Sequence, residues 1–151
     1  MESRKPLSAA LVGSWSLRSR EDRNAAGELR PEPSLGSDPI AFLVFDKGGN
    51  FAAQFMRRVP VTGPEPDRPA ALAPNNTWTR GGYDAYFGTY TVDDGAGTVV
   101  TLLQGALSRE NVGRSFTRAI TVTGDDLVLR LETATPAGEP VTRTLQWRRV
   151  G

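Results

Sequence analysis

The sequence predicts an all-β fold, an eight-stranded antiparallel up-and-down β-barrel with a short helical turn at its N-terminal end. Apolar and polar side chains alternate in one run after another, as they do in strands with one buried and one solvated face. Turns rich in glycine, proline and aspartate separate these runs at roughly even spacing. The later connections are short, which favours a meander over a Greek key, and such a meander closes when its last strand pairs with its first.

The composition is that of one globular domain. At 151 residues the chain is long enough to bury a core without metals or disulfides, so we expect residues 1–151 to form a single domain. The 18 basic residues nearly balance the 17 acidic residues, which argues against a nucleic-acid partner. Because no stretch reaches membrane-spanning length or has the pattern of a signal peptide, we expect a cytoplasmic protein with no membrane insertion.

Cysteine and histidine are both absent. Their absence excludes disulfides, a thiolate nucleophile, a Ser-His-Asp triad, histidine-ligated haem and the usual zinc sites. The adjacent carboxylates at residues 93–94 and 125–126 lie beside glycines, where turn formation explains them fully. We therefore expect no metal and no cofactor, and catalysis would have to use carboxylates, tyrosine, lysine, arginine or backbone dipoles.

The first part of the chain predicts a helical turn, a strand and an irregular crossing. Residues 8–12 suit one or two helical turns that end at Gly13. A strand follows over residues 14–20, with the alternation of a half-buried strand. Residues 28–38 are rich in proline and glycine, which predicts an irregular crossing rather than a strand.

A β-hairpin is the best-defined local element. The apolar run 40–45 and the return run 51–57 flank a turn at residues 46–50, where paired glycines supply the positive φ that such turns need. The remaining strands are predicted over residues 86–92, 98–107, 115–122, 127–132 and 141–149.

Between the hairpin and the later strands lies a long proline-rich loop, residues 59–82. Loops of this length in compact domains are mobile or functional, so we interpret it as a candidate lid. Residues 69–73 suit one helical turn within it. Trp78 near its end is an apolar anchor that either docks the loop or contacts a ligand.

A tryptophan near each end of the chain carries a family resemblance. Gly13-Ser14-Trp15, after a short helical lead-in and before a strand, resembles the G-x-W signature of lipocalins. In that family an arginine from the last strand covers the tryptophan at the closed end of the barrel. The resemblance implies that Arg148 or Arg149 covers Trp15, while Trp147 aligns with core positions.

The chain is most similar to the bacterial and fungal lipocalin-like domain proteins, whose fold is a calycin-type β-barrel. The motifs that carry this resemblance, in order, are residues 11–15, 38–45, 54–57, 86–90, 111–113 with Arg118, and 145–148. The wider family includes binders, isomerases and cyclases. Relatives often carry histidine and glutamate on the strand that here reads Thr101-Leu102-Leu103-Gln104, so acid–base chemistry that depends on those groups is not implied for this chain.

Strand alternation singles out side chains for the barrel interior. Phe116 and Arg118 share an apolar face, and an inward arginine requires a carboxylate, hydrogen-bond acceptors, water or an anionic ligand. Tyr86 and Tyr90 share a face with Gly88, where a missing side chain leaves room.

The remaining candidates are Gln54, Met56 and Gln104. As inward groups, the two glutamines would orient a ligand in an otherwise apolar pocket, and the alternative is that either side chain points to solvent.

Three functions remain open. The first is binding of a small hydrophobic molecule inside the barrel by a monomer or homodimer. The second is a cofactor-independent isomerase or cyclase for a polyketide- or lipid-like substrate, with a carbonyl polarised by Arg118 or a tyrosine hydroxyl. The third is a fully packed barrel with a structural or interaction role. A cavity favours the first two, a strongly shifted pKa inside it favours the second, and a filled interior with an exposed apolar patch favours the third.

Overall fold

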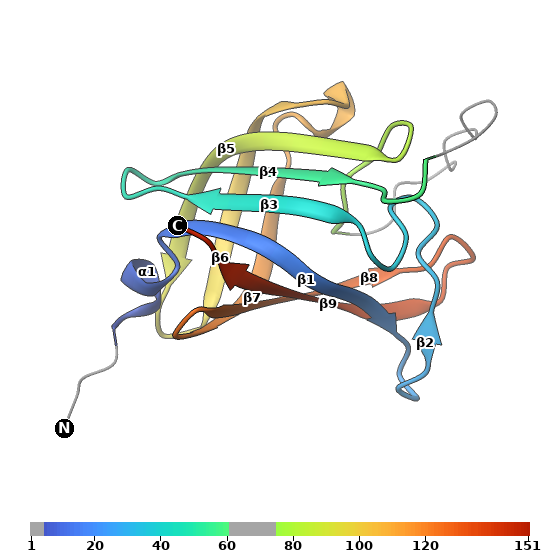
Figure 1. Cartoon of the computed structure of the whole chain (residues 1–151), viewed down its shortest axis with the longest axis horizontal. Coiled ribbons are helices and arrows are strands. Elements are labelled where there is room, and N and C mark those ends of the chain that lie inside the picture. Colours follow the sequence, from blue (N-terminus) through green and yellow to red (C-terminus); the bar gives the residue numbers. More distant parts are fainter. Residues whose placement is uncertain (1–4, 61–74) are drawn as a thin grey trace.

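The structure, a computed structural model of the protein, describes residues 5–60 and 75–151, and its strands form one antiparallel sheet that closes on itself (Figure 1). In chain order the elements are α1 (Leu7–Ala10), β1 (Gly13–Arg23), β2 (Leu29–Arg30), β3 (Ile40–Phe45), β4 (Asn50–Met56), β5 (Tyr83–Asp93), β6 (Thr98–Ala106), the 3-10 helix η1 (Arg109–Asn111), β7 (Ser115–Thr123), β8 (Asp126–Ala134) and β9 (Pro140–Arg149).

Neighbouring barrel strands follow the chain, from β1 through β3 to β9, and β9 pairs with β1 to close the sheet. The closing pair runs from Trp15 opposite Arg149 to Arg23 opposite Thr142. The prediction of a closed eight-stranded up-and-down barrel with a short N-terminal helix is therefore confirmed. The two-residue strand β2 pairs with the end of β1, within the crossing that the sequence predicts to be irregular.

The core follows from the alternation of side chains along the strands. On β3 and β4, Leu43, Phe45, Phe51 and Phe55 point inward and are buried. The Phe45 and Phe51 rings stack with centroids 6.3 Å apart, and Phe55 meets Trp147 of β9 edge-on at 5.8 Å. Aromatic side chains from both ends of the chain therefore fill one shared interior.

Helix α1 covers one end of the barrel, beside the C-terminus (Figure 1). The indole N–H of Trp15 donates to the Leu11 carbonyl at 2.9 Å, and the Arg149 guanidinium lies 4.3 Å from the centre of the Trp15 ring. Arg149 also donates to the carbonyls of Ala10 at 2.7 Å and Val12 at 2.8 Å. Arg149 is therefore the arginine that covers the tryptophan.

Arg148, the other candidate for that contact, is exposed and pairs with Asp126 at 3.3 Å. Adjacent residues on a strand point to opposite faces, so the closed end can use only one of the two arginines.

The other end of the barrel is crossed by residues 31–38 and by residues 75–80, and the second of these segments belongs to the predicted lid at residues 59–82. The helical turn predicted at residues 69–73 lies outside the described residues. Among the helices that the structure describes, none combines the length and apolar character needed to cross a membrane.

Candidate functional site

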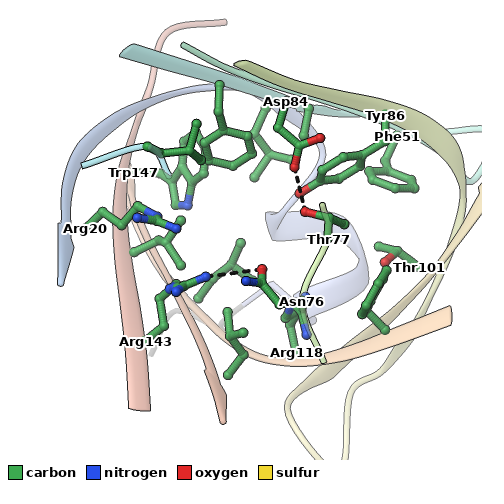
Figure 2. Close-up of a pocket in the computed structure, with 18 of the residues that line it drawn as sticks. Arg20, Phe51, Asn76, Thr77, Asp84, Tyr86, Thr101, Arg118, Arg143 and Trp147 are labelled. Atoms are coloured by element: carbon green, nitrogen blue, oxygen red, sulfur yellow. Dashed lines mark hydrogen bonds between the residues drawn. The ribbon is translucent and has the colours of Figure 1, made fainter. Parts of the chain in front are cut away.

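A cavity lies inside the barrel and reaches the end opposite α1 (Figure 2). Ser34, Leu35, Asn76, Thr77 and Thr79 line it on the side of the two crossing segments. Its free volume is about 80 Å³, well below the roughly 300–1,000 Å³ of pockets that hold drug-sized ligands. Its deeper walls are mostly apolar and include Phe45, Phe51, Phe55, Phe116, Leu145 and Trp147.

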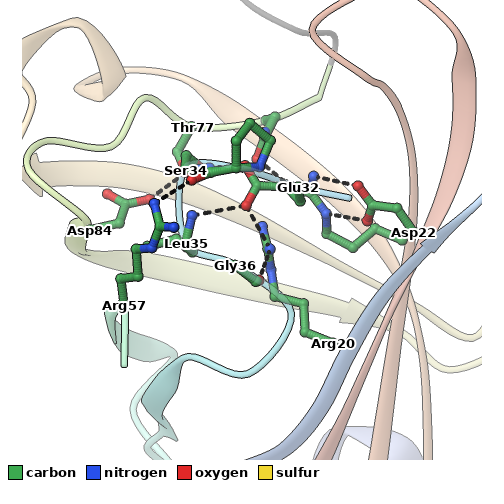
Figure 3. Close-up of polar contacts among 12 residues, drawn as sticks. Arg20, Asp22, Glu32, Ser34, Leu35, Gly36, Arg57, Thr77 and Asp84 are labelled. Carbon is green, nitrogen blue, oxygen red and sulfur yellow. Dashed lines mark hydrogen bonds and ion pairs between the residues drawn. The ribbon is translucent and has the colours of Figure 1, made fainter. Parts of the chain in front are cut away.

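Glu32 ties the crossing at residues 31–38 to the barrel (Figure 3). Its carboxylate accepts from the Arg20 guanidinium at 2.9 Å and from the backbone N–H groups of Ser34 at 3.0 Å and Leu35 at 2.9 Å. Burial by itself would raise the pKa of Glu32, but the charge of Arg20 and the hydrogen bonds from the Ser34 hydroxyl and the Leu35 N–H outweigh burial and lower it to about 2. The crossing is therefore held by an ionised carboxylate.

Residues 75–80 are held over the cavity by side chains of the barrel. The Asn76 carbonyl accepts from Arg114 at 2.6 Å, and the Thr77 hydroxyl donates to the Asp84 carboxylate at 2.5 Å. Two hydrogen bonds join the Trp78 backbone to the buried side chain of Asn111, at 3.0 and 3.1 Å. Asn111 thus fixes the loop beside Trp78, the residue for which we expected either a docking role or ligand contact.

Two arginines in the interior have carboxylate partners. Arg143 makes a bidentate pair with Asp22 at 2.8 and 3.0 Å, and both side chains are buried. Arg143 also donates to the Asn76 side chain at 3.2 Å, so it links the β1–β9 seam to the loop above the cavity. Arg20 pairs with Glu32 as described.

Arg118 of β7 also lines the cavity, but no carboxylate of the described residues pairs with it. Its guanidinium lies 4.8 Å from the centre of the Phe116 ring, and its Nη1 is buried without a hydrogen-bond partner among the described residues. Burial lowers the pKa of Arg118 to about 10, so the group remains a cation at neutral pH.

Asp84 and Tyr86, two residues apart on β5, point into the same cavity (Figure 2). Burial raises the pKa of Asp84 to about 6, although the Thr77 hydroxyl, the Ala85 N–H and Arg20 act in the opposite direction. Burial also raises the pKa of the Tyr86 hydroxyl, and the nearby Asp84 carboxylate adds to that rise. The Oδ1 atom of Asp84 has no partner within the part of the chain that the structure describes.

Trp147 of β9 adds a second buried donor to the cavity wall. Its Nε1 is buried and has no hydrogen-bond partner in residues 5–60 and 75–151. Buried N–H groups nearly always have a partner, which makes an orphaned donor on a cavity wall a candidate ligand contact.

Three of the seven predicted ligand-binding residues, Tyr86, Phe116 and Arg118, line the cavity, and their contact with a ligand remains a prediction. Tyr90 also turns inward, but it packs on Phe45 with ring centroids 4.9 Å apart and its hydroxyl donates to the Asp46 carbonyl at 2.5 Å. Tyr90 therefore closes the hairpin side of the core and is not part of the cavity wall.

The expectation that Gln54, Met56 and Gln104 face the interior is wrong. All three side chains are exposed on the outer face of β4 and β6. Both faces of these strands carry apolar residues, so alternation alone does not show which face is buried. On β4, the face with the larger apolar side chains is the buried one. Phe51 and Phe55 fill the interior, and Met56 on the other face is 46% exposed.

Sequence reasoning missed Arg20, Asp84 and Arg143 on the cavity wall. Alternation could have identified two of them, because Asp84 shares a face with Tyr86 and Arg143 shares a face with Leu145. It could not have identified Arg20, because an irregularity in the β1–β9 pairing between Leu17 and Ser19 changes which residues of β1 face inward.

No group of three or more acidic side chains in the described residues is arranged to hold a metal ion. The lining instead combines aromatic walls with cations, one carboxyl group and hydroxyl groups, which suits reversible binding of an organic molecule.

The sequence matches one protein family over most of its length. The family model for the lipocalin-like domain matches residues 12–150. Among solved structures, a complex of bovine odorant binding protein with a selenium-containing odorant matches at 16% identity and a TM-score of 0.47, covering 100% of this chain and 77% of that chain. No curated protein matches the sequence. Because the family model spans nearly the whole chain, the protein belongs to the lipocalin-like domain family.

Proposed function

We propose that the protein binds a small hydrophobic molecule in the cavity of its barrel. Lipocalin-like proteins typically bind small hydrophobic ligands. The observation that carries the proposal is the lining itself. Arg118 and Trp147 have buried polar groups with no hydrogen-bond partner among the described residues, and both side chains line a cavity with aromatic walls.

The size of the cavity restricts the ligand. A free volume of about 80 Å³ is smaller than the apolar cavity of about 150 Å³ that is known to hold benzene, so the ligand has to be compact and lining side chains have to shift to admit a ring. Aromatic or short aliphatic compounds are therefore better candidates than long lipids.

A cavity-filling variant tests the proposal. Ala53 is buried on β4 and lines the cavity, whereas its neighbour Ala52 points to the outer face. We expect Ala53→Leu to weaken the binding of small hydrophobic compounds at least about tenfold, by occupying their space, and Ala52→Leu to leave affinity unchanged. Isothermal titration calorimetry with small aromatic and aliphatic compounds measures both. Equal affinities in the two variants would place binding outside the barrel.

One observation favours an isomerase or cyclase as the second candidate. Asp84, with its pKa raised to about 6, lies in the cavity with the Tyr86 hydroxyl, and groups that titrate near neutral pH are suited to proton transfer. Turnover of a bound carbonyl compound that is lost in Asp84→Asn, with binding retained, would support catalysis over binding alone.

A packed barrel with an interaction role has its own supporting observation. The outer face of β3 to β6 exposes large apolar side chains, namely Ile40, Phe42, Met56, Phe87, Val100 and Leu102. Failure of all small compounds to bind, together with self-association that is abolished by Phe42→Ser and Phe87→Ser, would favour this third function.

A further inference from the structure

The charges inside the barrel do not balance in pairs. Arg20 has Glu32 at 2.9 Å, and Arg143 has Asp22 at 2.8 Å. Arg118 forms neither an ion pair nor a hydrogen bond with any residue in the described ranges. Burying a cation without a counter-charge is unfavourable, so a group of opposite charge near Arg118 would stabilise it.

In residues 5–60 and 75–151, no carboxylate is placed to neutralise Arg118. Glu32 and Asp22 are paired with the other two arginines, and Asp84 is not among the groups whose charge acts on Arg118. The charged and titratable groups that act on Arg118 are Tyr86, which keeps its proton at neutral pH, and two further cations, Arg114 and Arg143. This side of the cavity therefore carries an excess of positive charge.

The position of Arg118 makes that charge available to a ligand. The side chain lies on the cavity wall (Figure 2). Its guanidinium lies over the Phe116 ring, and its buried Nη1 has no acceptor among the described residues. In the described part of the chain, Arg118 lacks a counter-charge and an acceptor for Nη1. A hydrophobic molecule with a carboxylate group would supply both, since its charge neutralises the guanidinium and its oxygen accepts from Nη1. A neutral carbonyl compound would supply only the second.

We propose that the ligand of this barrel is a small hydrophobic carboxylic acid, bound as its anion, with the carboxylate on Arg118 and the apolar part against the aromatic walls. This inference rests on the proposed binding function and narrows it to one class of ligand. The small free volume restricts the acid to a single ring or a short chain.

Matched pairs of compounds test the proposal on the full chain. Benzoic acid with benzamide, and hexanoic acid with hexanamide, have the same shape and differ in charge. We expect the wild type to bind each acid about tenfold or more tightly than its amide at neutral pH, by isothermal titration calorimetry. Arg118→Gln is expected to abolish this preference and to retain the amide affinity. Arg130→Gln, which removes an exposed arginine from β8, is the control and should keep the preference.

A second measurement follows the wild type itself and uses the conservative variant Arg118→Lys only to assign one signal. In ¹H–¹⁵N spectra, the arginine Nε–H signal that is present in the wild type and missing from Arg118→Lys belongs to Arg118. We expect this signal in the wild-type spectrum to shift when each acid is added and not when its amide is added.

The outcomes separate the two proposals. Equal binding of acid and amide would overturn the carboxylic acid and leave the hydrophobic pocket intact, whereas no binding of any compound would overturn both. If chloride displaced the acids with equal strength, the site would be a general anion site and the proposal would be wrong.

Discussion

Arginine has a different role at each of three positions in this barrel, and its neighbours decide which. Arg149 stacks on Trp15 and donates to the carbonyls at the end of α1, so it closes one end. Arg143 is neutralised by Asp22 and holds a strand seam. Arg118 is buried with no such partner among the described residues, and we propose that a ligand supplies the missing charge. At the residue scale, function follows from which charges the fold leaves uncompensated.

Asp84 gives a pH-dependent prediction at this scale. In the folded protein, burial disfavours the charged form of Asp84 and raises its pKa to about 6. In the unfolded chain its pKa is near the ordinary value of 3.8. The folded state therefore holds the extra proton between about pH 4 and pH 6, and stability falls as the pH rises through that interval. We expect Asp84→Asn to lack this fall, so that the variant gains up to about 3 kcal/mol relative to the wild type by pH 6.5.

Urea unfolding of both proteins across that pH range measures the difference. Protonation of Glu32 at lower pH lowers the stability of both proteins and cancels in the comparison. A difference that stayed constant from pH 4 to pH 6.5 would contradict the raised pKa of Asp84.

At the scale of elements, strand β1 shows how local backbone geometry sets the site. Gly13 begins the strand with φ of 142°, and a Cβ there would lie 2.5 Å from the Arg149 Nη1 and 2.6 Å from the Gly151 carbonyl oxygen. Further along, the irregularity between Leu17 and Ser19 turns Arg20 and Asp22 inward, toward the cavity and the β9 seam. One strand thus shapes the closed end and supplies two charges to the open end.

Substitution of Gly13 tests the crowding at the closed end. We expect Gly13→Ala to lower the free energy of unfolding by at least about 2 kcal/mol, because it combines an unfavourable φ with a steric clash. Gly27→Ala is the matched control, since Gly27 has φ of 81° with open space around it, and should lose only about 1 kcal/mol. Equal losses in urea unfolding would show that Arg149 and the C-terminal residue move aside at no cost.

At the scale of the whole molecule, the barrel depends on the pairing of its first and last strands. This pairing joins residues more than a hundred positions apart, and the buried Asp22–Arg143 pair lies within it. The same arginine reaches Asn76 above the cavity, so closure of the barrel and placement of the loop are coupled.

The buried pair is expected to be sensitive to the loss of one partner. Asp22→Asn should lower the free energy of unfolding by roughly 3–5 kcal/mol, because it leaves Arg143 buried with no counter-charge. The exposed pair of Asp126 and Arg148 joins β8 and β9 and supplies a control, for which Asp126→Asn should cost less than about 1 kcal/mol. Similar losses in chemical denaturation would mean that the buried pair is neutralised by other groups.

The barrel fold could be predicted from the sequence alone, because the alternation of side chains along a strand and the residues that form turns are local properties. Neighbouring residues were enough to predict the strand count, the meander and the hairpin of β3 and β4. They also predicted the inward direction of Tyr86, Phe116 and Arg118.

Which face of β4 and β6 is buried could not be predicted from the sequence. Both faces carry apolar side chains, and the buried face is the one that packs against the strands across the barrel. The inward direction of Arg20 also follows from the tertiary structure. So does the finding that Arg118, unlike Arg20 and Arg143, has no counter-charge within the described residues. Ion pairs form between residues that are distant in the chain, and burial depends on the whole closed sheet, so neither property is encoded in any one segment.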